Sequence, residues 1–561
     1  FFSINHSCTF TKWTNLQLTS IMTKQASNYF LLVLGSLFIS SNIFLSCNDS
    51  TPDSRDKQVF RYNEHKNIGS LDPAFAKDNA DISAINQLFN GLVQMDSMMT
   101  VIPSIASSWQ ISEDAKVYTF QLRKEVYFHT HQLFGPAQTR TVTADDFVFS
   151  FDRLKNPQLA APGAWVLQNV ERYKAINSHS FQITLKTPFP AFLGLLTMKY
   201  CSVVPKEIVN HYGTDFRSNP IGTGPFKFKR WEENIKLIFR KNERYFETTK
   251  SGEKLPHLEA VAITFLADKQ SEFLQFVQGN IDYITGLDAS YKDDILQADG
   301  TLKPRYAPSI KMLRAPYLNT EYLGFYLDSE EPEYQNKQIR QALNYGFDRK
   351  KMMTYLRNGI GIPALGGFIP QGLPGHNEQL GYSYQPEKAK ELIEAYKTES
   401  GNQKPTITLT TTSNYLSFSE FIQRELQSIG LTIKIEVIPP SSLKSAKSNG
   451  KIDLFRASWV ADYPDAQNYL SLFYSANFAP NGPNYTHFKD EQFDTWYTQA
   501  LLETNQATRV DLYKKMDALV IEKAPVVVLF YDEVIRFTAV DIKGLGINPT
   551  NLLELKNVQK N

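Results

Sequence analysis

The sequence predicts an α/β protein of two or three domains. Its 561 residues exceed the roughly 250–300 residues at which a single hydrophobic core stops growing. Residues 406–411 alternate as a strand, a helical pattern follows and stops at Gly430, and residues 431–437 alternate again. This strand–helix–strand order predicts a right-handed crossover between parallel strands. The apolar run 524–530 predicts a buried central strand.

Earlier segments predict further strands and helices. Residues 118–122 and 181–185 alternate apolar and polar side chains, as half-buried strands do. Thr143 is placed to cap a helix that follows it. The two glycines of 222–224 do not form a phosphate loop, because Pro225 removes a backbone N–H that such a loop would use. They predict a tight turn that leads into a strand.

The composition narrows the class of protein. A net charge of +1 gives no support for binding nucleic acid. Aromatic residues make up 13% of the chain, which suits large cores or an aromatic cleft. The cysteines are Cys8, Cys47 and Cys201, and they show no metal-ligand spacing. We expect no metal and no cofactor.

The N-terminal segment predicts export. Residues 1–46 are expected to be upstream sequence and a signal peptide, with Met22 as the true start and an interrupted apolar run at 29–39. The end of this segment resembles a bacterial lipobox, although its Phe-Leu pair departs from the usual pattern. We therefore expect Cys47 to carry a lipid and residues 47–58 to act as a polar tether. A plain secreted protein or an uncleaved anchor is the alternative.

The stretch 453–470 is the candidate ligand site. A short apolar strand leads into Arg456, Trp459 and Asp462 at three-residue intervals, and Pro464 breaks the pattern. A cation, a large aromatic ring and an anion on one loop can hold a zwitterion. The same residues can also be solvated ends and a core tryptophan, which is the commoner arrangement.

Several motifs in order resemble one family. The sequence Arg-Ala-Ser-Trp-Val-Ala-Asp-Tyr at 456–463 is similar to the segment that closes the cleft of extracytoplasmic dipeptide- and oligopeptide-binding proteins of ABC importers. Pro-Ile-Gly-Thr-Gly-Pro-Phe at 220–226, Leu-Asp-Pro at 71–73 and Asn-Gly-Leu-Val at 90–93 resemble the same family. The resemblance covers about residues 59–545.

The resemblance implies a two-lobed periplasmic-binding-protein fold, class II-like, with a ligand cleft between the lobes and an additional third domain. The expected ranges are lobe I at 59–91, 200–315 and 525–561, the additional domain at 92–199, and lobe II at 316–524.

The resemblance also implies roles for individual residues. Asp462 would bind the α-amino group of a peptide, and Arg456 its carboxylate. Trp459 would exclude water beside them. The backbone of Ser458 and Val460 would pair with the peptide main chain in the manner of an added strand.

The function that follows is the substrate-binding component of an ABC importer, which captures short peptides and delivers them to membrane permease subunits. The protein would be an extracytoplasmic monomer held at the membrane by its lipid, with no enzymatic step. One alternative keeps the fold and replaces the peptide with a nickel chelate, a sugar or an opine. A more remote alternative is an extracytoplasmic peptidase with Asp462 and Asp465 as paired acids, although no nucleophile–base motif is present.

Overall fold

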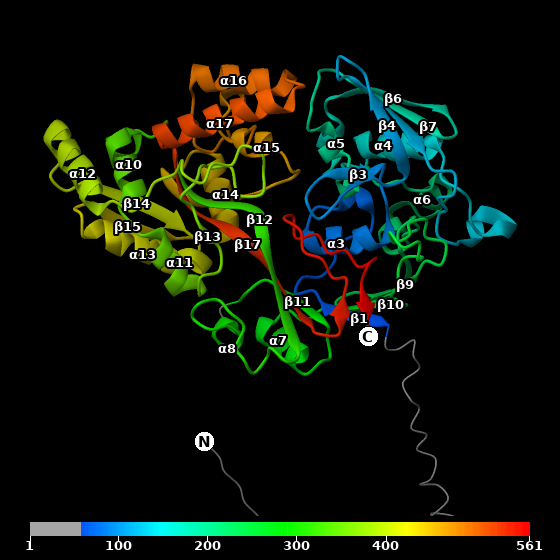
Figure 1. Ribbon diagram of the computed structural model, residues 1–561. Coiled ribbons are helices and arrows are strands. Elements are labelled where there is room, and N and C mark those ends of the chain that lie inside the picture. The colour runs from blue at the N-terminus through cyan, green and yellow to red at the C-terminus, as the bar shows by residue number, and fades with distance from the viewer. Residues whose placement is uncertain (1–57, 289) are drawn as a thin grey trace, which may run out of the picture. The chain divides into compact units, whose positions relative to one another are not determined.

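The protein is described by a computed structural model over residues 58–288 and 290–561. These residues belong to one compact unit (Figure 1). Its central feature is an eleven-stranded mixed sheet with the order β15-β14-β16-β12-β17-β11-β1-β10-β9-β8, in which β13 also pairs with β17. Helices pack against this sheet, so the predicted α/β class is confirmed.

The half of the sheet formed by β11, β1, β10, β9 and β8, called the first half here because β1 lies in it, combines parallel and antiparallel strands. β1 (Val59–Asn63) runs parallel to β10 (Ala260–Thr264) and to β11 (Tyr283–Thr285). β9 (Lys236–Lys241) and β8 (Phe226–Glu232) extend it as an antiparallel hairpin. The helices of this part are α3 (Asn79–Leu88), α6 (Lys206–Tyr212), α7 (Lys269–Val277) and α8 (Lys292–Ile295).

The glycine-rich turn enters this half of the sheet as predicted. The strand β8 begins at Phe226, directly after the turn. A Cβ on Gly224 would overlap the backbone of Leu88 and lie 2.5 Å from the carbonyl oxygen of Gln87. The turn therefore lies against the end of α3, and glycine is needed there because of close packing.

The second half of the sheet, which contains β13, β14, β15 and β16, confirms the predicted crossover. β14 (Thr406–Thr411) runs parallel to β15 (Thr432–Val437), and α13 (Leu416–Gln427) connects them. β16 (Leu454–Val460) is parallel to β14. Further elements of this part are β13 (Ile362–Pro363), α9 (Pro332–Gln335), α10 (Lys337–Tyr345), α11 (Arg349–Arg357), α12 (Pro386–Ser400), α14 (Pro440–Ser448), α15 (Ala466–Leu470), α16 (Glu491–Leu502) and α17 (Gln506–Lys523).

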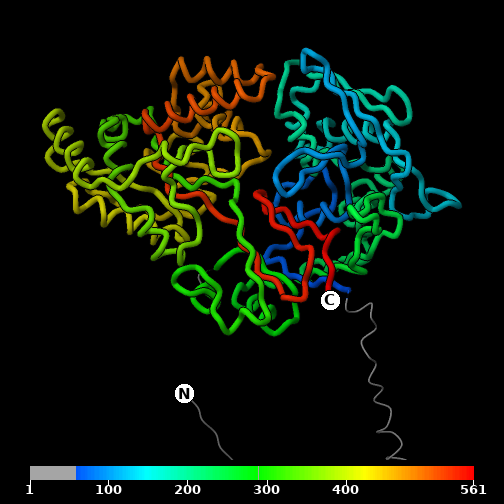
Figure 2. Tube along the Cα trace, in the orientation of Figure 1, coloured from blue at the N-terminus to red at the C-terminus, as the bar shows by residue number. Residues whose placement is uncertain are grey.

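Two long strands join the halves. β12 (Ile310–Phe325) and β17 (Val526–Ala539) pair antiparallel along most of their lengths. The start of β12 lies against the part of β17 that also pairs with β11, and the end of β12 pairs with β16. The register shifts between Pro316 and Thr320. Figure 2 shows the two traces running side by side between the two parts of the unit.

A separate four-stranded antiparallel sheet carries its own core. Its order is β4-β5-β7-β6, and Phe120 of β5 lies opposite Phe181 of β7. Helix α4 packs on it behind the predicted Thr143 cap, which is part of a capping box with Asp146. The elements of this region are β2 (Val93–Met95), β3 (Val101–Pro103), β4 (Ala106–Ile111), β5 (Val117–Leu122), α4 (Ala144–Lys155), β6 (Val170–Asn177), β7 (Ser180–Leu185) and α5 (Phe192–Leu195).

The predicted start at Met22, the signal peptide and the lipidated Cys47 lie outside the described residues. Within 58–288 and 290–561, no helix combines the length and apolar character needed to cross a membrane. The chain ends in a short pair of strands, β18 (Ile542–Lys543) and β19 (Gln559–Lys560). The domain boundaries expected from the sequence stay a prediction.

Candidate functional site

The candidate site begins where β16 ends. Phe455 and Ala457 point into the core, whereas Arg456 and Ser458, in alternation with them, are only partly buried. Val460 closes the strand with 43% of its surface exposed. Val460 and the residues that follow it, 461–464, line a cavity, so the strand delivers this loop to the cavity wall.

The loop after β16 is held by Asn468, a buried residue of α15. Its Oδ1 accepts hydrogen bonds from Trp459 Nε1 at 2.8 Å and from the backbone N–H of Asp462 at 3.3 Å. Its Nδ2 donates to Asp462 Oδ2 at 3.2 Å. One amide therefore fixes both predicted site residues relative to each other. Asn468 was not predicted as a site residue, although it lies in the same 453–470 stretch.

Asp462 is a carboxylate without a cation. Among residues 58–288 and 290–561, no basic side chain comes within ion-pair distance of it. Its side chain is exposed to the hollow, yet the protein around it raises the pKa of Asp462 above its ordinary value by desolvation. An incompletely solvated carboxylate of this kind suits an ammonium group supplied by a ligand.

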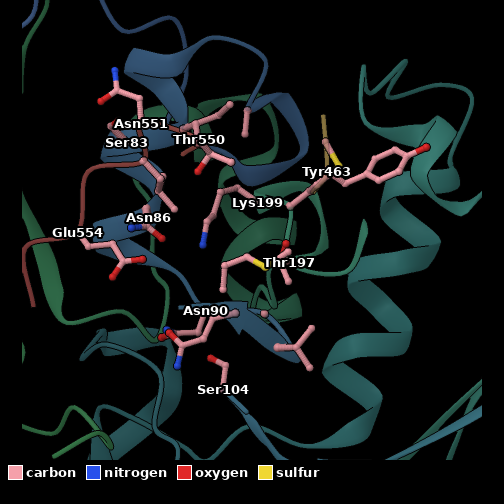
Figure 3. Close-up of a pocket in the computed structure, with 18 of the residues that line it drawn as sticks. Ser83, Asn86, Asn90, Ser104, Thr197, Lys199, Tyr463, Thr550, Asn551 and Glu554 are labelled. Atoms are coloured by element: carbon pink, nitrogen blue, oxygen red, sulfur yellow. The ribbon is translucent and has the colours of Figure 1, made fainter. Parts of the chain in front are cut away.

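The hollow beside Asp462 is a cavity of about 170 Å³. It is lined by the end of β16 and the loop that follows, by α3, by the segment around Lys199, and by the C-terminal segment 550–556. Figure 3 shows these groups converging, with Asn86 from α3 and Asn90 just after that helix on one side and Thr197 and Tyr463 on another. Both halves of the central sheet therefore contribute walls to one cavity.

Arg456 lies on the same strand but does not line this cavity. Its guanidinium forms an ion pair with Glu321 of β12, and its Cζ lies 3.3 Å from the ring centroid of Tyr415. Glu321 is only 2% exposed, and burial raises its pKa while Arg456 opposes the rise. Asn319 Nδ2 also donates to Glu321 at 3.0 Å. Glu321 and Tyr415 were not predicted as partners of Arg456, because they come from distant segments of the chain.

The backbone of β16 has one free edge. β12 pairs with the whole strand from Leu454 to Val460. On the other side, β14 pairs with it in the described chain only at Thr410, which lies opposite Phe455. Residues 456–460 therefore have a strand neighbour on one side only, and their other edge can accept the main chain of a ligand.

Asp465 is occupied by structural contacts. Its carboxylate caps α15 by accepting from the backbone N–H of Gln467 at 2.9 Å. Tyr513 donates to it at 2.7 Å, and Arg509 lies 3.5 Å away. A carboxylate with three such partners holds the loop in place and is not free to pair with Asp462.

Comparison with known proteins gives a consistent match. Residues 100–481 match the family described as bacterial extracellular solute-binding proteins, family 5 (middle). The dipeptide-binding protein of Escherichia coli (strain K12) is 25% identical over 93% of this chain and 95% of that protein. Heme-binding protein A of Haemophilus influenzae is 27% identical over 88% and 91%.

Among solved structures, the periplasmic binding protein DppA from Helicobacter pylori in complex with the peptide STSA has a TM-score of 0.73 at 24% identity. The match covers 91% of this chain and 100% of that one. It supports the same two-lobed periplasmic-binding fold that the sequence predicts. The relatives differ in the ligands that their names carry.

Proposed function

Because the chain belongs to the bacterial extracellular solute-binding proteins of family 5, we propose that it captures short peptides for an ABC importer. The observation that carries the proposal is Asp462, a carboxylate held by Asn468 at the edge of a cavity and lacking a cation in the described chain. An α-ammonium group is common to all unmodified peptides, so this one contact serves many sequences.

The peptide would lie along the free edge of β16. Its main chain would pair with the backbone of Ser458 and Val460, and Trp459 would exclude water beside the ammonium. Arg456 would meet the carboxylate of a short peptide. A guanidinium has five N–H donors, and that of Arg456 already pairs with Glu321. Only the N–H groups left over would donate to the ligand.

We propose further that a lipid on Cys47 holds the protein at the outer side of the membrane, next to its permease, and that it binds without catalysis. Release and capture would require only movement of the lobes. The engagement of Asp465 by Tyr513 and Arg509 supports this reading, because the paired-acid peptidase needs that carboxylate free.

Native mass spectrometry tests the proposal directly. The full chain is purified without denaturation, and bound molecules are identified from their masses. A ladder of short peptides supports peptide capture and shows the preferred lengths. A protein that ignores a peptide mixture but shifts with haem, an opine or a nickel chelate would keep the fold and overturn the ligand. The Asp462→Asn variant should carry no peptide ladder.

A further inference from the structure

A second charged group faces the same cavity. Lys199 follows α5 and lines the hollow together with Asp462. Figure 3 shows its amine directed into the hollow, toward the side where Asn86 and Glu554 lie. No described residue accepts a hydrogen bond from this amine or forms an ion pair with it. The side chain is nevertheless largely enclosed, and burial lowers the pKa of Lys199 from 10.5 to about 8.

The acids nearby leave Lys199 incompletely neutralised. Glu247 is already taken, because Lys556 Nζ lies 2.7 Å from its Oε2, and Gln94 Nε2 donates to its Oε1 at 2.8 Å. Glu554 lines the cavity and its charge acts on Lys199, but the two do not approach within 4.0 Å. A half-buried ammonium without a direct partner is costly to the free protein. A group supplied from outside would remove that cost.

We propose that Lys199 binds a carboxylate of the ligand, which gives this protein a preference for peptides with an acidic group close to their amino terminus. The inference rests on the proposed function, since Asp462 must hold the α-ammonium. The two charges line one cavity of about 170 Å³, which is smaller than the ~300 Å³ at which whole drug-sized ligands are usually held. A ligand that occupies this one cavity can therefore present its ammonium to Asp462 and a carboxylate to Lys199.

Two groups of a peptide can supply this carboxylate. One is an aspartate or glutamate side chain at the first or second residue, because each residue spans at most about 3.6 Å of chain. The other is the terminal carboxylate of a dipeptide, which would then bind Lys199 in place of Arg456, since only Lys199 of the two lines this cavity. Asn86 and Asn90 line the same cavity; the Nδ2 group of each already donates one hydrogen bond, and its second N–H can donate to either carboxylate. Tyr200, next in sequence, lines the same cavity; burial raises the pKa of its hydroxyl, and the charge of Asp462 adds to that rise.

The competing explanation is that Lys199 forms a water-mediated ion pair with Glu554 and does not bind ligands. The two explanations differ in the effect of Glu554→Gln. If Lys199 awaits a ligand carboxylate, removal of the neighbouring negative charge should strengthen the binding of acidic peptides, about three-fold or more. If the two residues serve each other, that change should leave the choice of peptide unaltered.

The test is isothermal titration calorimetry on the full chain with matched peptide pairs. Glu-Ala-Ala and Ala-Glu-Ala are compared with their glutamine counterparts, and Ala-Ala with its C-terminal amide. Wild type is compared with Lys199→Met, with Lys199→Gln as a second uncharged variant, and with Lys124→Met, which removes the same charge from an exposed position.

We expect at least ten-fold tighter binding of one acidic member by wild type and by the Lys124 variant, and loss of that preference in both Lys199 variants. The pair that responds identifies the source of the carboxylate. Equal affinities within every pair, with peptides still bound, would overturn this inference and leave the proposed function standing. Absence of binding by any peptide would instead remove the proposed function itself.

Discussion

Asp462→Asn tests the ligand anchor most directly. The substitution keeps the size of the side chain and an oxygen that can still accept from Asn468 Nδ2, so the loop should hold its shape. What it removes is the negative charge. In the bound state a peptide would cover that charge, and a broken covered ion pair costs about 3–5 kcal/mol. Because the empty site is open to solvent, we take the lower end, about 3 kcal/mol, which corresponds to roughly 100-fold weaker binding.

Calorimetry with tri-alanine measures this loss, and thermal unfolding gives an independent readout. At a peptide concentration of 100 Kd, wild type should gain about 2.7 kcal/mol of stability, whereas the variant at the same concentration should gain only about 0.4 kcal/mol. Asp145→Asn, at an exposed position of α4, is the matched control and should behave as wild type.

The free protein adds a second criterion. Desolvation raises the pKa of Asp462 in the folded state, so ionisation of this group lowers stability as the pH rises through that pKa. The empty variant should therefore unfold at the same temperature as wild type or a higher one. A folded Asp462→Asn protein that binds tri-alanine with unchanged affinity would refute the ammonium assignment.

As the pH rises from 6.5 to 9.5, the preference for a glutamate peptide over its glutamine counterpart should disappear, because Lys199 loses its proton near its pKa of about 8. Calorimetry at both pH values measures the ratio of the two affinities, and a ratio that stays constant contradicts the prediction. Arg456→Ala should destabilise the fold by about 3 kcal/mol, because it leaves the buried Glu321 unpaired. Adding Glu321→Gln to the same chain should restore most of the lost free energy of unfolding, measured with denaturant. A double variant as unstable as Arg456→Ala would argue against the pairing. Gly224→Ala should cost at least about 2 kcal/mol, because its methyl group has no space beside Leu88, and an unchanged unfolding temperature would disprove the close approach.

The fold was predictable wherever the pattern was local. The crossover at 406–437 appears as β14, α13 and β15 because alternation and helical spacing depend only on neighbouring residues. The strand predicted at 524–530 is real but incomplete, since β17 continues to Ala539. Polar residues conceal that continuation. Arg536, for example, is 1% exposed and donates to the carbonyl oxygen of Gly546, a contact that no local pattern reveals.

The candidate site divides in the same way. Arg456, Trp459 and Asp462 could be selected from the sequence because one strand and its loop carry all three. Glu321 and Lys199 could not, because they reach the site only through the order of strands in the sheet and the path of the segment after α5. Their importance comes from being charged and enclosed, which is a property of the folded chain.

The pairing of β12 with β17 makes the half of the sheet that contains β13, β14, β15 and β16 a single continuous insertion in the chain. The chain enters that half along one strand and leaves it along the other, and Pro316 lies opposite Glu533 where the two strands pass between the halves. Everything between those two positions is covalently attached to the rest only there. The segment between these positions could thus be replaced as a whole by the equivalent segment of a related protein whose ends pair in the same way. Such a replacement would change the residue at Asp462 and leave the part of the cavity wall that carries Lys199 unchanged.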